Sequence, residues 1–154
     1  MIGRRVAILG GLLALAAGCS KPAPPDEATL RAEDKLVLEG IVDSDVRASQ
    51  AMREADTATG KGDSDAAADA VSARARPAIE EALRGAESAT LKTDWGRSKR
   101  EELLAILRDR KAEMPKYEEA VKSGDPEKML AAIEAQAAIE RRALATVAAV
   151  KTGR

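Results

Sequence analysis

The near absence of aromatic side chains constrains the fold of this chain more than any other feature. The 154 residues contain no Phe, and Trp95 and Tyr117 are the only aromatic residues. The core must therefore be built from Ala, Leu, Ile, Val and Met, which remove less apolar area per residue than aromatic rings do, at about 25 cal/mol per Å². Alanine favours helices but has little bulk. This composition predicts closely packed helices around a modest core.

Apolar residues recur at helical spacing in four segments, each roughly 25 to 34 residues long. The apolar faces of the first two segments consist of Leu30, Val37, Ile41, Ala48, Met52 and Ala55, and of Ala67, Val71, Ala75, Ala78, Ala82 and Ala86 with Ile79 and Leu83 beside them. Those of the last two consist of Leu103, Ile106, Leu107, Met114, Tyr117 and Val121, and of Met129, Ile133, Ala137, Leu144, Val147 and Val150. Alternation typical of β-strands is absent from the sequence, so the predicted class is all-α.

Capping and turn residues separate the segments. Asp26 can cap the first helix, Gly60–Gly62 ends it, and Asp63 or Ser64 caps a second helix of about 64–89. Gly40 lies inside the first helix and costs about 1 kcal/mol against Ala, which weakens the prediction of a single unbroken rod.

The third helix has two candidate starting points. Ser98 opens a capping-box pattern, although Asp94 could start the helix one turn earlier. Ser123-Gly124 closes this helix, and Asp125 followed by Pro126 opens the fourth with a cap and a proline at its first position. Short connections favour antiparallel neighbours, so we predict an up-down four-helix bundle of long Ala-rich helices.

Two prolines fall inside the predicted helices. Pro77 should kink the second helix near Ala73 or begin a new helix, and Pro115 interrupts the third apolar face. Mid-helix prolines can open a bundle locally.

The first residues have the layout of a secretory leader. Arg4 and Arg5 precede the apolar run Val6–Ala17, which is followed by Gly18 and by Cys19, the only cysteine. A membrane-spanning helix needs roughly 20 apolar residues, so this run is too short to span. The division expected is a signal peptide at 1–18, an anchor and Pro-rich linker at 19–25, and a helical domain at 26–154.

This leader resembles the bacterial lipoprotein class, whose lipobox reads Leu-Ala/Ser-Gly/Ala-Cys. Ala17, Gly18 and Cys19 match its last three places, while Ala16 occupies the place where Leu is most usual. The resemblance implies cleavage between Gly18 and Cys19, lipid on the Cys19 sulfur and acylation of the new amino group. Ser20 after the cysteine implies an outer-membrane address in enteric-type bacteria. An ordinary signal peptide and twin-arginine export through Arg4-Arg5 are the alternatives.

Composition argues against several classes of function. Without the two arginines of the leader the chain has 23 basic and 26 acidic residues, a balance that gives no electrostatic reason to bind nucleic acid. Histidine is absent, so the usual bases for Ser or Thr nucleophiles and the usual haem and di-iron ligands are missing. Asp63, Asp65 and Asp69 lack the EF-hand pattern and suit a helix N-terminus. We therefore expect no catalytic residue, no metal and no cofactor.

Two regions remain candidates for binding. Trp95 precedes Arg97 and Arg100, and because Trp and Arg are frequent at binding hot spots this group is the candidate partner contact. The same residues could instead cap the core or form a cation–π contact. Gln136 and Glu140 lie near the fourth apolar face, where the carboxylate could contact a ligand or rest at the edge with its charged end in water.

The sequence thus favours a non-enzymatic envelope lipoprotein. It would be held at the outer membrane by the lipid on Cys19, face the periplasm and act through contacts with an envelope protein. A periplasmic small-ligand binder or sensor using the bundle interior is the alternative, as is a lipoprotein inhibitor or immunity factor. Self-association is also plausible, because a thin core gains from burying more surface.

Overall fold

The computed structural model describes residues 25–154, and helices make up nearly all of this part of the chain. The elements in order are α1 (Glu27–Gly60), α2 (Ser64–Asp69), the π-helix η1 (Ala70–Ala75), α3 (Arg76–Ser88), α4 (Asp94–Ser123) and α5 (Pro126–Thr152). Residues 25–154 contain no strand, so the predicted all-α class is confirmed. The expected signal peptide, the lipobox with Gly18 and Cys19, and the linker up to residue 24 lie outside the described residues.

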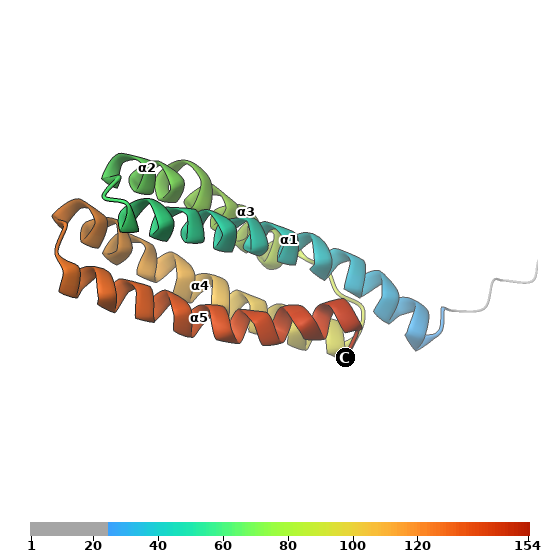
Figure 1. Ribbon diagram of the computed structural model, residues 1–154. Helices are drawn as coiled ribbons and strands as arrows, with labels where there is room; N and C mark the ends of the chain where they lie inside the picture. Colours follow the sequence, from blue (N-terminus) through green and yellow to red (C-terminus); the bar gives the residue numbers. More distant parts are fainter. Residues whose placement is uncertain (1–24) are drawn as a thin grey trace, which may run out of the picture.

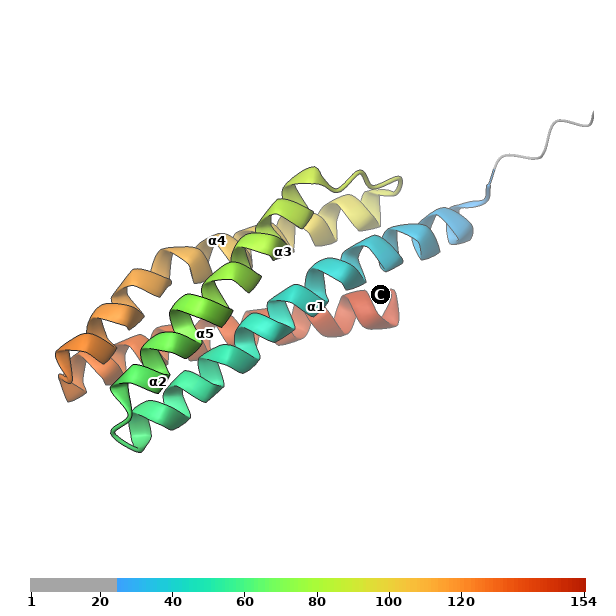
Figure 2. The same ribbon diagram turned by 90° about the horizontal axis from the view of Figure 1, so that it is seen from above.

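The helices form a bundle of four long rods. The elements α2, η1 and α3 follow one another without a break and make up one rod, and α1, α4 and α5 make up the other three. Figures 1 and 2 show the rods lying lengthwise beside one another. The α1–α2 and α4–α5 turns lie at one end, whereas the N-terminus of α1, the α3–α4 connection and the C-terminus lie at the other.

The π-helix η1 lies where the sequence predicted a kink. Pro77 has no backbone N–H, and the N–H of Arg76 donates to the carbonyl of Val71, five residues back. Ala67, Val71 and Ala75, which are four residues apart, are all buried. The whole predicted face of this rod is buried as well.

Neither Gly40, which weakened the prediction of an unbroken rod, nor the predicted interruption at Pro115 breaks its helix. The first rod runs unbroken through Gly40, and α4 continues through Pro115. Of the two candidate starts of the third predicted helix, Ser98 was wrong and Asp94 is confirmed, because Asp94 is the first residue of α4. Thr93 is the N-cap of α4, and its hydroxyl accepts a hydrogen bond from the N–H of Gly96 at 3.0 Å. The predicted caps Asp26, Asp63 and Asp125 are confirmed, because each side chain accepts a bond from the first turn of its helix.

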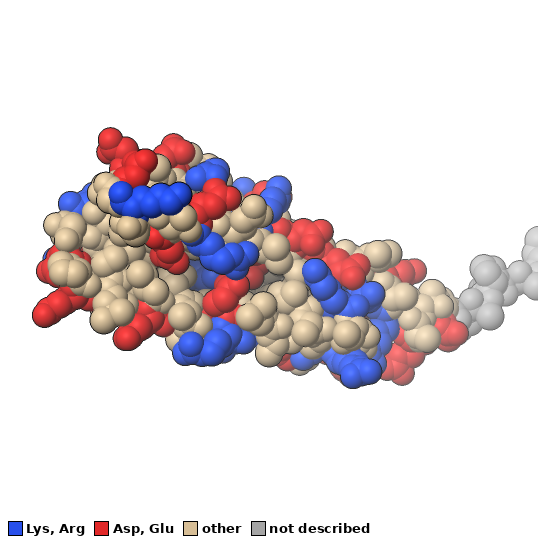
Figure 3. All heavy atoms as spheres, in the orientation of Figure 1, with Lys and Arg blue, Asp and Glu red and all other residues tan. Residues whose placement is uncertain are grey.

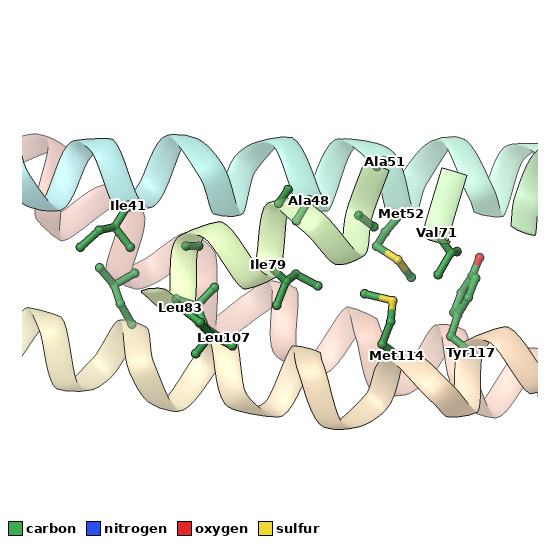
Figure 4. Close-up of a cluster of buried hydrophobic side chains, with 14 of the residues drawn as sticks. Ile41, Ala48, Ala51, Met52, Val71, Ile79, Leu83, Leu107, Met114 and Tyr117 are labelled. Atoms are coloured by element: carbon green, nitrogen blue, oxygen red, sulfur yellow. The ribbon is translucent and has the colours of Figure 1, made fainter. Parts of the chain in front are cut away.

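The main core lies between α1, the second rod and α4. In Figure 4, Met52 of α1 and Met114 of α4 reach toward each other, and Tyr117 points its ring across to α1. Tyr117 is buried and donates its hydroxyl to Asp56. The predicted apolar face of α4 is buried throughout, which gives this helix the central place in the core.

The fourth rod, α5, departs from its predicted face. Ile133 and Leu144 were expected inside but are 37% and 59% exposed. The buried side chains of α5 are instead Ala132, Gln136, Ile139, Ala143, Thr146 and Val150. Ile139 and Ala143 pack with Ile106 of α4 in a small cluster separate from the main core. No helix among residues 25–154 is long and apolar enough to cross a membrane.

Candidate functional site

Charged side chains interrupt the apolar faces of α1 and α4 at the same level of the bundle. Asp45 lies between Ile41 and Ala48 on the buried face of α1. Arg110 lies between Leu107 and Met114 on the buried face of α4. Asp45 is 1% and Arg110 2% exposed. The helices therefore bring opposite charges together away from water.

Arg110 binds residues from two neighbouring helices. Its Nε lies 2.8 Å from Oδ1 of Asp45 on α1, and its Nη2 lies 2.7 Å from Oε2 of Glu140 on α5. Nη2 also donates to the Ser49 hydroxyl at 2.9 Å, which in turn donates to Oε2 of Glu140 at 2.9 Å. At the rim, Nη1 of Arg53 lies 3.2 Å from Oε1 of Glu140. Two carboxylates and two guanidinium groups balance one another in this ionic cluster.

The two carboxyl groups of the cluster have opposite pKa shifts. Burial raises the pKa of Asp45 above its ordinary value, aided by the nearby charge of Glu140, and the opposing attraction of Arg110 does not compensate. Burial also acts to raise the pKa of Glu140, but hydrogen bonds from Arg110 and Ser49 outweigh it and hold that pKa below its ordinary value.

A hollow of about 200 Å³ adjoins this ionic cluster between α1, α4 and α5. Met52, Ile133 and Ala137 supply apolar wall, and Gln136 lines the hollow beside Glu140. Gln136 is 8% exposed, and its Nε2 has no hydrogen-bond partner within residues 25–154. A buried amide without a partner costs about 1–3 kcal/mol, so a polar ligand atom or water would gain by binding there.

A second polar centre holds the α3–α4 connection. Both oxygens of buried Asp34 accept backbone hydrogen bonds at 2.8 Å, from Lys92 and Thr93, and the Thr93 hydroxyl donates at 2.6 Å. Gly96 is required here, since a Cβ at this position would lie 2.4 Å from Oδ2 of Asp34. Burial opposes ionisation, but these hydrogen bonds keep the pKa of Asp34 below its ordinary value. This centre fixes the start of α4.

The predicted contact residues Trp95, Arg97 and Arg100 lie beside that connection. The indole N–H of Trp95 donates to the carbonyl of Arg154 at 2.8 Å, and the guanidinium of Arg31 lies 4.7 Å from the ring centroid. Arg97 and Arg100 are not the cation over the indole.

Instead, these two arginines bind the α3–α4 connection. Arg97 donates to the carbonyl of Leu91 at 3.3 Å, and Arg100 donates to that of Ala89 at 3.1 Å. Together with the Trp95–Arg154 bond, these contacts fasten the chain at this end of the bundle. A partner contact at this end stays a prediction.

Sequence reasoning missed most of the ionic cluster. It singled out Gln136 and Glu140 but not Asp45, Ser49 or Arg110. A signal was present, because Asp45 and Arg110 are three or four residues from apolar neighbours on both sides and therefore fall on the faces that had to be buried. Opposite charges on two buried faces indicate an ion pair.

The charged and hydrogen-bonding groups around the hollow beside the ionic cluster could bind a ligand. No group of three or more His, Cys, Asp or Glu side chains within residues 25–154 could hold a metal ion. Arg110 is engaged by Asp45, Ser49 and Glu140, whereas Nε2 of Gln136 is a buried polar atom of the hollow without a hydrogen-bond partner in the described residues. Comparison with protein-family models, with curated proteins and with solved structures found no match to this chain.

Proposed function

We propose that this protein is an envelope lipoprotein that acts by protein contact rather than by catalysis. In this proposal the chain is cleaved before Cys19, carries lipid there, and holds an up-down four-helix bundle at the periplasmic face of the outer membrane. The Pro-rich linker would space the bundle by about 20 Å, at about 3.1 Å per residue.

The observation that carries this proposal is an uncovered apolar face on α5. Leu130 and Leu144 are each 59% exposed, although the chain has few large side chains with which to build its core. Surface leucines that occur singly need no explanation, but several on one helix face favour a protein partner. The contact surface then differs from the one predicted around Trp95.

The anchor and the contact are tested separately. Labelling with a radioactive fatty acid should mark the full chain and not the Cys19→Ser variant, and only the labelled chain should sediment with membranes. Pull-down from detergent-solubilised membranes should then recover a stoichiometric partner, either a second protein or another copy of the chain. A full chain that takes up no label and stays in the soluble fraction would contradict the anchor; a partner-free monomer would contradict the contact.

A small-ligand binder is the second candidate, and the unpartnered amide of Gln136 favours it. Its hollow would accept a small molecule with a hydrogen-bond acceptor for Nε2 and an apolar part against Met52 and Ile133. In a thermal-shift screen, a ligand at 100 times its dissociation constant would stabilise the fold by about 2.7 kcal/mol. The Gln136→Leu variant should lose that shift. An inhibitor or immunity factor would act through protein contact, and pull-down would identify its target.

A further inference from the structure

The outward face of α5 has a regular apolar pattern. Leu130, Ala137 and Leu144 are seven residues apart, a spacing that brings them to one side of the helix. All three are exposed. In Figure 3, side chains other than Lys, Arg, Asp and Glu gather over α5, between clusters of charged ones. The outward side of α5 therefore carries an apolar stripe.

Between Met129 and Val150 of α5, two charged residues have no ionic partner in the described part of the chain. Four charged residues lie between Met129 and Val150, and two of them, Glu140 and Arg142, pair with Arg110 and Asp109 of α4. The other two, Glu134 and Arg141, are exposed and take part in no ion pair or hydrogen bond within residues 25–154. Charged residues elsewhere often pair between helices, as Arg47 does with Glu81 and Arg76 with Glu118.

These positions are symmetric about Ala137 and Ala138. Leu130 lies seven residues before Ala137, and Leu144 lies six residues after Ala138. Glu134 and Arg141 are equally far from the midpoint between the two alanines. A two-fold axis there would set Leu130 of one helix against Leu144 of an antiparallel copy and Glu134 against Arg141. Alanines at the crossing allow the helices to approach closely.

We propose that the partner for this surface is a second copy of the same chain, docked antiparallel along α5. The apolar stripe is self-complementary, and each copy supplies one acid and one base to the other, which gives two ion pairs per dimer. A second copy would cover the apolar stripe and would also supply ionic partners for Glu134 and Arg141. The proposal rests on the proposed contact function and names its partner.

Cross-linking in cells that express the full chain tests the geometry. The Ala137→Cys variant should give a dimer with a short bismaleimide, because residue 137 lies beside its mate at the crossing. The Ala148→Cys variant should not, since 21 residues between mates in an antiparallel pair correspond to about 30 Å at 1.5 Å per residue. The parent chain, whose only cysteine is Cys19, sets the background. Equal cross-linking at 137 and 148, or none at 137, overturns the proposal.

A charge exchange tests the pairing. In the Ala137→Cys background, Glu134→Arg or Arg141→Glu alone places like charges opposite each other twice, and the cross-linked fraction should fall about tenfold. The double variant Glu134→Arg/Arg141→Glu should restore it. Leu144→Glu should also abolish the dimer, whereas Leu36→Glu, at a 70% exposed leucine on α1, should not.

The folded state of each variant is checked by its helical circular dichroism. A double variant that stays as low as the single variants refutes the antiparallel register. A chain that sediments with membranes and recovers another protein, but gives no dimer, refutes only the second copy as partner and leaves the proposed contact function intact.

Discussion

Arg110 shows how a thin core can tolerate a buried charge. Removing a guanidinium and a carboxylate from water costs several kcal/mol per ion, and their attraction offsets that cost only with good geometry and further hydrogen bonds. Here Asp45 lies in an ion pair with Arg110 at 2.8 Å, and Ser49 and Glu140 accept hydrogen bonds from Arg110 at 2.9 and 2.7 Å. Because these partners come from α1 and α5, Arg110 ties α4 to both helices at a fixed level. The ionic cluster specifies register where alanines alone would not.

We expect Arg110→Met to destabilise the protein by about 3–5 kcal/mol, because it leaves Asp45 buried without a cation. The double variant Asp45→Leu/Arg110→Met removes both charges and should be more stable than Arg110→Met alone. Urea unfolding followed by circular dichroism measures both. Free energies that simply add in the double variant would show that Asp45 and Arg110 do not interact.

The opposite pKa shifts in the ionic cluster predict opposite pH effects. The folded-state pKa of Glu140 lies below its ordinary value of 4.5, so the stability from its ionised form is present above pH 4.5 and is lost as the pH falls. The folded-state pKa of Asp45 lies above its ordinary value of 3.8, so the folded state binds the extra proton and acidification toward that value favours folding.

Unfolding free energies from pH 7 to pH 4 check this pair. The advantage of the parent chain over Glu140→Gln should shrink as the pH falls, whereas its advantage over Asp45→Asn should grow. Glu87→Gln, at an exposed position on α3, serves as the control. Parallel trends for Glu140→Gln and Asp45→Asn would contradict the assigned shifts.

At the scale of helices, the capping residues made the sequence informative. Asp26, Asp63 and Asp125 act through bonds to their own first turns, so local sequence suffices to find them. Thr93 differs, because its position depends on Asp34, 59 residues away in the chain. Ser98 offered an equally good local pattern. Only the long-range contact decides between the two.

The face of α5 was hard to predict for another reason. The helix is so rich in alanine that apolar residues occur on every side, and periodicity gives little preference for one face. Gln136 and Thr146 are buried while Leu130 and Leu144 are exposed, the reverse of what side-chain polarity suggests. Polar contacts of α5 with α4 and α1, such as Glu140 with Arg110, set its orientation.

Two glycines, one inside a helix and one at a helix end, give a prediction about helix stability. Gly40 lies inside α1, and a Cβ added there would meet no other atom within 4 Å, so Gly40→Ala should stabilise the protein by about 0.5–1 kcal/mol. Gly124 ends α4 with φ of 63°, and Gly124→Ala should cost about 1–2 kcal/mol. Thermal melts of both variants measure the contrast. Equal shifts of the same sign would contradict these backbone assignments.

At the scale of the whole molecule, the position of the N-terminus sets the orientation in the proposed envelope. The N-terminus of α1, the α3–α4 connection and the C-terminus share one end of the bundle (Figure 1). A lipid on Cys19 would therefore hold Trp95 and its neighbours near the bilayer. The Gly60–Asp63 turn would lie farther out by the length of α1, which for 34 residues is about 50 Å. The face of α5 would run along the side of such an upright bundle, and two chains anchored in one membrane could pair antiparallel along it only by lying along the membrane surface.

This orientation predicts which end of the bundle approaches lipid. In vesicles that carry the acylated chain, a fluorophore on Thr90→Cys should be strongly quenched by an acceptor on the lipid headgroups, and one on Lys61→Cys weakly. Both residues are exposed, at opposite ends of the bundle, so the fluorophores are matched except in their distance from the anchor. The Cys19→Ser form of each variant, which should not bind the vesicles, gives the background. Stronger quenching at residue 61 would mean that the bundle folds back over its linker, and the side of α5 would then face the membrane surface or be shielded by it. Strong quenching at residue 90 alone would describe single bundles that stand upright on the bilayer; an antiparallel pair of chains anchored in one membrane would instead lie along its surface, and both residues 90 and 61 would be quenched.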